Sequence, residues 1–159
     1  MVKVRTANIT DLPGINRVIE GAVMSWDLPE RVKRLSLPSY YYSEMDLQHL
    51  EIIITEENEK IIALASWEVA EEKDTPDQQH GLLIHGLYVH PATQNQGLGT
   101  QLFRAIENIA KEKSLDGLLV KAQKDAIVFF EKLGMQPLTV TNPDKDYKNR
   151  FWKSLYTSP

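Results

Sequence analysis

The residues best suited to chemistry lie between positions 80 and 100. Two glycines, Gly97 and Gly99, stand one residue apart in the segment QNQGLG, between an apolar run and an amphipathic one. The backbone N–H groups of such a turn can approach an anion closely, and the N-terminus of a following helix adds a favourable dipole. The pair predicts either a phosphate-binding turn or a tight turn in which the glycines serve packing alone.

Two better-known phosphate motifs do not fit this segment. The nucleotide P-loop needs Lys and then Ser or Thr after its last glycine, whereas Gly99 is followed by Thr100 and Gln101. The dinucleotide-binding pattern needs a third glycine where this chain has Leu102. Residues 94–102 contain no Asp or Glu, although an acid in the first turn would stabilise a helix. The segment therefore favours an anion other than a P-loop nucleotide or a dinucleotide.

Three histidines are the candidate side chains for acid–base chemistry or metal binding. His80, His85 and His90 are spaced by five, which puts neighbours on opposite faces of a strand, so we expect no shared metal site. His85 is the candidate general base, because it is the polar member of an otherwise apolar strand face. The other members of that face are Leu83, Leu87 and Val89. The alternative is a structural, half-buried histidine.

The composition limits the class of protein. With 159 residues and 42% hydrophobic residues, the chain is predicted to form a single domain over residues 1–159. The net charge of −4 argues against nucleic-acid binding and suits a cationic substrate. The lack of cysteine excludes disulfides and a catalytic thiol. No segment resembles a leader or a bilayer span, so we expect a cytoplasmic protein without a membrane partner.

Apolar periodicity places these residues on a series of elements. A strand opens the chain, two helices follow, and an irregular segment over residues 39–48 precedes a hairpin that turns at residues 57–59. The histidines then lie on or beside a strand, and QNQGLG begins the clearest helix. The predicted strands cover residues 2–7, 50–56, 60–72, 81–90, 117–122, 135–140 and 149–157, and the predicted helices cover residues 11–22, 28–35, 98–113 and 125–133. Residues 142–146 are predicted to form the last turn. This order indicates one α/β domain on a mixed sheet.

The segment QNQGLG resembles the Gln/Arg-x-x-Gly-x-Gly/Ala acetyl-CoA signature of the GNAT superfamily of N-acetyltransferases. LYVHP before it, DAIVFFEKLGM at residues 125–135, VRTANITDLPGI at residues 4–15 and FWKSL at residues 151–155 are similar to other elements of that family. The resemblance implies a GNAT fold with a central mixed, mostly antiparallel sheet of about seven strands, flanked by about four helices. Strands 4 and 5 of that sheet splay apart in the family.

The resemblance implies acetyl-CoA as cosubstrate. Residues 94–99 would wrap the pyrophosphate with backbone N–H groups, and Leu87 to Val89 would pair main-chain groups with the pantetheine arm. The expected cofactor-binding residues are Leu87, Tyr88, Val89, Gln94, Asn95, Gln96, Gly97, Leu98, Gly99, Thr100, Gln123, Ala126, Phe129 and Phe130. No metal is expected to take part.

The resemblance also bears on catalysis. His85 lies nine residues before the signature, where arylalkylamine N-acetyltransferases carry a histidine that helps deprotonate the amine, although Leu83 replaces their second histidine. We expect the backbone N–H of Val89, or of a neighbour at a bulge, to stabilise the oxyanion. Phe130 stands where the family has a tyrosine that protonates the thiolate. Tyr88 or one of residues 40–42 would substitute, or the thiolate leaves unaided.

The sequence therefore predicts transfer of an acetyl group from acetyl-CoA to a primary amine of a small molecule, in a ternary complex. A peptide or protein acceptor, at an N-terminus or a lysine, is one alternative. A catalytically weak acyl-CoA-binding sensor is another, motivated by Phe130. Exposed strand edges leave a homodimer open.

Overall fold

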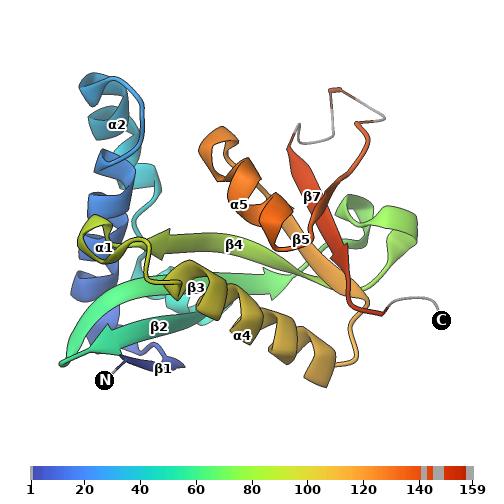
Figure 1. Cartoon of the computed structure of the whole chain (residues 1–159), viewed down its shortest axis with the longest axis horizontal. Coiled ribbons are helices and arrows are strands. Elements are labelled where there is room, and N and C mark those ends of the chain that lie inside the picture. The colour runs from blue at the N-terminus through green and yellow to red at the C-terminus, as the bar shows by residue number, and fades with distance from the viewer. Residues whose placement is uncertain (1, 141–142, 145–148, 157–159) are drawn as a thin grey trace. The chain divides into compact units, whose positions relative to one another are not determined.

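The computed structural model describes residues 2–140, 143–144 and 149–156 (Figure 1). The helices are α1 (Leu12–Met24), α2 (Glu30–Ser36), α3 (Glu44–His49), α4 (Leu98–Glu112) and α5 (Ile127–Lys132). The strands are β1 (Val2–Thr6), β2 (Glu51–Glu57), β3 (Lys60–Val69), β4 (Gly81–Val89), β5 (Gly117–Lys121), β6 (Gln136–Pro137) and β7 (Arg150–Ser154). These elements confirm the predicted α/β class, and the predicted turn at residues 142–146 lies largely outside the described residues.

The strands form one mixed sheet in the order β1-β2-β3-β4-β5-β7-β6 over the described residues. The β1–β2, β5–β7 and β6–β7 pairs are antiparallel, whereas β4 and β5 are parallel. The β4–β5 register runs from Gly81 opposite Gly117 to Ile84 opposite Val120, and β4 continues to Val89 beyond the last described pair. The splay between strands 4 and 5 stays a prediction.

The chain divides into two compact units, residues 1–66 with 86–103, and residues 67–85 with 104–159. In the first unit, the apolar stripe of α1 packs with β2 and β3 in one core, because α1 repeats apolar residues at helical spacing. Ile15, Val18 and Ile19 of that stripe are completely buried. The prediction of a single domain over residues 1–159 stays a prediction.

The second unit is held together by β5, β6 and β7 and by a buried acid of α4. The Glu107 carboxylate pairs with Arg104 at 3.0 Å and with Lys153 of β7 at 2.5 Å. Burial raises the pKa of Glu107, but these cations outweigh burial and leave the pKa below its usual value. The predicted strand at residues 135–140 shortens to Gln136–Pro137, where Pro137 has no N–H to offer the ladder.

Helix α3 corrects the prediction of irregular structure at residues 39–48. Its six residues are too few to show an apolar period, but its start is fixed by a capping box. The Ser43 N–H donates to the Asp46 carboxylate at 2.8 Å, and the Asp46 N–H donates back to the Ser43 hydroxyl at 3.4 Å. A serine followed three residues later by an acid was the available signal.

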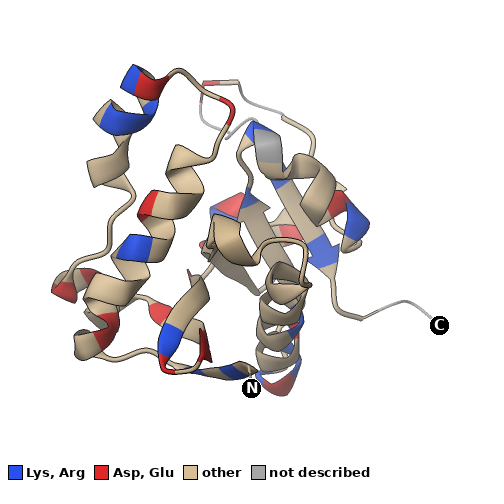
Figure 2. Cartoon of the chain, turned by 60° about the vertical axis from the view of Figure 1, so that its left-hand side comes forward, with Lys and Arg blue, Asp and Glu red and all other residues tan. Residues whose placement is uncertain are grey.

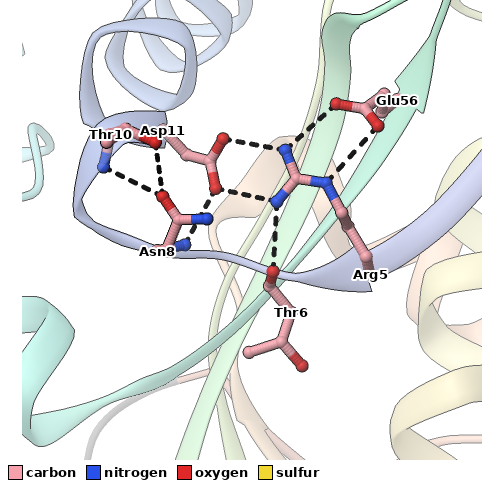
Figure 3. A network of polar contacts seen from close by, with 6 residues as sticks. All are labelled: Arg5, Thr6, Asn8, Thr10, Asp11 and Glu56. Carbon is pink, nitrogen blue, oxygen red and sulfur yellow. Dashed lines mark hydrogen bonds and ion pairs between the residues drawn. The ribbon is translucent and has the colours of Figure 1, made fainter.

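An ion-pair network ties β1, β2 and the start of α1 together (Figure 3). The Arg5 guanidinium donates to both Asp11 carboxylate oxygens at 2.9 Å and to Glu56 Oε2 at 3.0 Å. Asp11 also accepts the Asn8 N–H at 2.8 Å. The Arg5 hydrogen bonds, and then that of the Asn8 N–H, outweigh burial and lower the pKa of Asp11.

Replacing Asp11 with asparagine should lower the free energy of unfolding by about 1 to 3 kcal/mol near neutral pH, because Arg5 loses a charged partner. The folded-state pKa of Asp11 lies below the ordinary value of 3.8, so its contribution is complete above that value and disappears as the pH falls through the lower folded-state pKa. Thermal unfolding of both proteins between pH 7 and pH 3 checks this. A stability difference that does not shrink in acid would contradict it.

Candidate functional site

The signature segment leaves β4 through a short 3-10 turn, Pro91–Thr93, and reaches α4 at Leu98. The imidazole of His90 begins that turn, because its Nδ1 accepts the Ala92 N–H at 3.2 Å. Burial, followed by the nearby cations Arg17 and Lys60, lowers the pKa of His90, which favours the neutral ring that this hydrogen bond requires.

Backbone conformation explains the glycine at position 97. Gly97 has φ of 77°, in the left-handed region that side chains disfavour, and a Cβ there would meet nothing within 4 Å. Glycine is therefore required by backbone geometry and not by packing. Asn95 also has positive φ, at 66°. This outcome favours the turn that presents its backbone over the turn whose glycines serve packing alone.

The turn exposes a run of backbone donors. The Gly97 carbonyl accepts the first helical bond, from the Gln101 N–H at 3.0 Å, so the N–H groups of residues 98–100 precede the helical ladder. Within the described part of the chain, residues 95–100 donate no backbone hydrogen bond. Residues 94–97 and Thr100 are exposed, whereas Leu98 is buried and anchors the helix start. Six successive N–H groups thus have no acceptor within the described part of the protein.

The electrostatics of this helix start agree with an anion. Residues 91–103 carry no charged side chain, and the first turn of α4 has no acid (Figure 2). Lys111 lies in the last turn of α4. The positive end of the helix dipole is therefore not neutralised by the protein's own side chains. A bound anion would gain both the dipole and the unpaired N–H groups.

The predicted catalytic residues lie on β4. His85 is exposed, whereas Leu87, Tyr88 and Val89 are half-buried. Strand alternation puts His85, Leu87 and Val89 on one face and Tyr88 on the other. The roles of His85 as base and of the Val89 N–H as oxyanion donor stay predictions.

Tyrosines 42 and 88, two of the candidate replacements for the missing acid, lie in the first unit. Burial raises the pKa of Tyr42 to about 12. Burial, followed by Tyr42 and Tyr40, also raises the pKa of Tyr88. Both phenols therefore stay protonated at neutral pH. The Tyr42 hydroxyl is engaged with the Ser66 hydroxyl at 2.6 Å. Sequence reasoning missed Ser66, and Gly86 inside β4 was the available signal, because glycine within a strand often marks a close approach.

Four of the predicted cofactor-binding residues lie in the second unit. Gln123 is exposed and begins the 3-10 turn Lys124–Ala126, where its carbonyl accepts the Ala126 N–H at 2.9 Å. Phe129 is half-buried, and Phe130 is buried with its ring edge-on to Phe129 at 5.1 Å between centroids. Position 130 therefore offers no phenol that could protonate the thiolate. The cofactor contacts of these residues stay predictions.

The three histidines do not form a metal centre in the described structure. His80 donates its backbone N–H to Asp116 at 2.8 Å, and its ring lies 3.7 Å from Glu72. Among the described residues, no three histidine or carboxylate side chains are grouped as metal ligands would be. No helix in the described ranges combines the length and apolar character that crossing a bilayer needs.

Comparison with solved structures supports the fold. The chain is similar to the PaiA N-acetyltransferase from Thermoplasma acidophilum in complex with coenzyme A, with 14% identity, a TM-score of 0.76, and coverage of 97% of this chain and 99% of that one. The N-acetylglutamate synthase from Neisseria gonorrhoeae, complexed with coenzyme A and N-acetyl-glutamate, is 18% identical to this chain with a TM-score of 0.71, and the match covers 99% of this chain and 36% of that one. The ribosomal-protein alanine N-acetyltransferase from Escherichia coli is 18% identical with a TM-score of 0.65, and the match covers 100% of this chain and 97% of that one.

A family model decides the identity that these distant likenesses leave open. The model described as the acetyltransferase (GNAT) family matches residues 21–135, which is more than two thirds of the chain. The match includes β4, the signature turn, α4 and α5, the elements that carry the predicted cofactor-binding residues. This protein belongs to the acetyltransferase (GNAT) family.

Proposed function

We propose that this protein transfers the acetyl group of acetyl-CoA to a primary amine of a small molecule by direct attack in a ternary complex. The observation that carries the donor half is the run of unpaired N–H groups at residues 95–100, on an acid-free helix start. That arrangement suits the pyrophosphate of CoA. The family match and the CoA complexes of two similar structures support the same donor.

The reaction needs a neutral amine and a stabilised oxyanion. The amine nitrogen attacks the thioester carbonyl, the C–N bond forms, and the C–S bond breaks with the electron pair leaving on sulfur. In the proposal, His85 accepts the proton of the ammonium directly or through water. The Val89 N–H donates to the oxyanion. The attacking nitrogen loses its second proton to water as the amide forms. The thiolate takes up a proton from water, or from Tyr88 or one of the tyrosines at residues 40–42.

Three candidates are considered for the acceptor side of the reaction. The net charge of −4 favours a cationic small molecule. A peptide or protein acceptor is the second candidate, because one similar structure is a ribosomal-protein alanine N-acetyltransferase. A weakly catalytic acyl-CoA sensor is the third candidate, because Phe130 supplies no phenol. The cytoplasmic location, the reaction without a metal and the homodimer stay predictions.

Coenzyme A should raise the melting temperature of the purified protein by about 5 to 10 °C at a ligand concentration of about one hundred times Kd. The physical reason is that the folded chain alone presents the turn that binds the pyrophosphate. Scanning calorimetry with CoA, with dephospho-CoA and with pantetheine locates the interaction. Because pantetheine lacks the pyrophosphate, it should produce a much smaller shift. Absence of any shift with CoA contradicts the proposed donor.

Release of CoA thiol separates the three acceptor candidates. We expect turnover with acetyl-CoA and a panel of small primary amines, and background rates with peptides that present a free N-terminus or a lysine. Higher turnover with peptides would replace the small-molecule proposal by the second candidate. CoA binding without turnover on either panel would favour the sensor.

A further inference from the structure

The face of β4 opposite His85 is packed against one tyrosine with its hydroxyl pointing at the strand backbone. A Cβ built on Gly86 would lie 2.6 Å from the Tyr42 hydroxyl and 2.8 Å from Cε2 of Tyr88. Both distances are shorter than real carbon contacts allow, so position 86 has no room for a side chain. The Tyr42 hydroxyl therefore touches the strand between His85 and Leu87.

Two polar groups from different elements fix Tyr42 in this place. The Asn16 side chain on α1 donates to the Tyr42 carbonyl at 2.9 Å and accepts the Tyr42 N–H at 2.8 Å. The Tyr42 hydroxyl shares a hydrogen bond of 2.6 Å with the Ser66 hydroxyl on β3. Tyr42 and Ser66 are 7% and 0% exposed, so water does not compete for this bond. The side chain is thus fixed at both ends.

This packing lies where β4 leaves its pairing with β5. The described pairs end at Ile84, while β4 continues to Val89 and carries the proposed oxyanion donor. Placement of such a donor must be accurate to a fraction of an ångström, since a shift of about 1 Å can cost about a hundredfold in rate. Packing against the opposite face of a strand is one way to obtain that accuracy.

We infer that Tyr42 is a positioning residue for acetyl transfer. With its backbone fixed by Asn16 and its hydroxyl by Ser66, Tyr42 holds the β4 backbone at Gly86 so that His85 and the Val89 N–H meet the thioester. The inference rests on the proposed function. It gives Tyr42 a mechanical role in place of the proton-donor role that the missing phenol at position 130 suggested.

Removing the Tyr42 hydroxyl should uncouple turnover from cofactor binding. Tyr42→Phe is expected to lower kcat about tenfold, with KM for acetyl-CoA and Kd for CoA changed less than about twofold. Ser66→Ala should do the same, because it breaks the same bond from β3. Thr55→Val is the matched control, because Thr55 also buries a hydroxyl on the sheet of this unit and that hydroxyl has no partner among the described residues. Its turnover should not change.

The double variant Tyr42→Phe/Ser66→Ala separates positioning from stability. Each single variant leaves the other hydroxyl of the pair buried without its partner, so the melting temperature should fall. Removing both hydroxyls should restore much of the lost melting temperature. If Tyr42 positions β4, kcat stays low in the double variant although stability returns. Recovery of kcat together with the melting temperature would overturn the inference, as would unchanged kcat in Tyr42→Phe.

A measurement that needs no acceptor tests the role of Tyr42 even if the proposed reaction fails. In ¹H–¹⁵N spectra of the CoA-saturated full chain, the amide resonances of residues 85–89 should move in Tyr42→Phe and in Ser66→Ala, and stay in place in Thr55→Val. If the wild type binds CoA but turns over no acceptor, moved resonances still support the role of Tyr42 and only the proposed reaction fails. Resonances at their wild-type positions in Tyr42→Phe would refute it.

Discussion

His85→Ala is expected to lower kcat with a primary amine about a hundredfold and to leave the Kd for CoA within about twofold of the wild type. An alkyl ammonium is almost fully protonated at neutral pH, so the rate depends on the group that removes its proton. His85 is exposed on β4, and in the proposal it accepts that proton directly or through one water. Steady-state rates of CoA release, with calorimetric titration of CoA, measure the two quantities.

The pH profile tests the role of His85 more sharply than the rate alone. Without the base, kcat/KM should keep rising with pH until the acceptor itself loses its proton, near pH 10 for an alkylamine. The wild type should level off at a lower pH. His85→Gln keeps a hydrogen-bonding side chain that cannot accept the ammonium proton, so it should resemble alanine. His80→Ala is the control on an exposed histidine. A variant with wild-type turnover across pH would exclude His85 as the base.

Local rules predicted most of the elements, because their signals are short-range. The hairpin turn at residues 57–59 is an example: Asn58 and Glu59 both have positive φ, at 52° and 66°, which matches a polar two-residue turn between β-rich runs. Helix α4 was predicted from its apolar period and its glycine start. Helix α3 was missed, because one capping box in six residues is a weaker signal than a period.

The supporting shell of the site could not be read from the sequence. Tyr42 lies 24 residues before Ser66 and 26 after Asn16, so their contacts depend on how α1 and β3 pack. A tyrosine cluster alone is compatible with packing, binding or acid catalysis. The proposed donor half of the site could be predicted from the sequence, because the groups proposed to bind CoA are consecutive backbone N–H groups of one contiguous segment. The acceptor half depends on side chains that only the fold brings together.

Thr100→Glu should change stability and cofactor binding in opposite directions. Thr100 is exposed in the first turn of α4, which has no acid of its own. A carboxylate there interacts favourably with the helix dipole, and should raise the melting temperature of the ligand-free protein by about 1 to 3 °C. The same charge would face the CoA pyrophosphate in low ionic strength, and should weaken CoA binding about tenfold. Calorimetric unfolding and CoA titration measure the two effects.

Thr100→Gln is the matched control, because glutamine has the size and helix propensity of glutamate without the charge. The difference in CoA affinity between the two variants therefore reports the charge alone, and it should shrink in about 1 M salt, where charges are screened over about 3 Å. Weaker binding by a more stable protein cannot result from misfolding. Equal CoA affinity of the Glu and Gln variants at low salt would show that the pyrophosphate does not bind at this helix start.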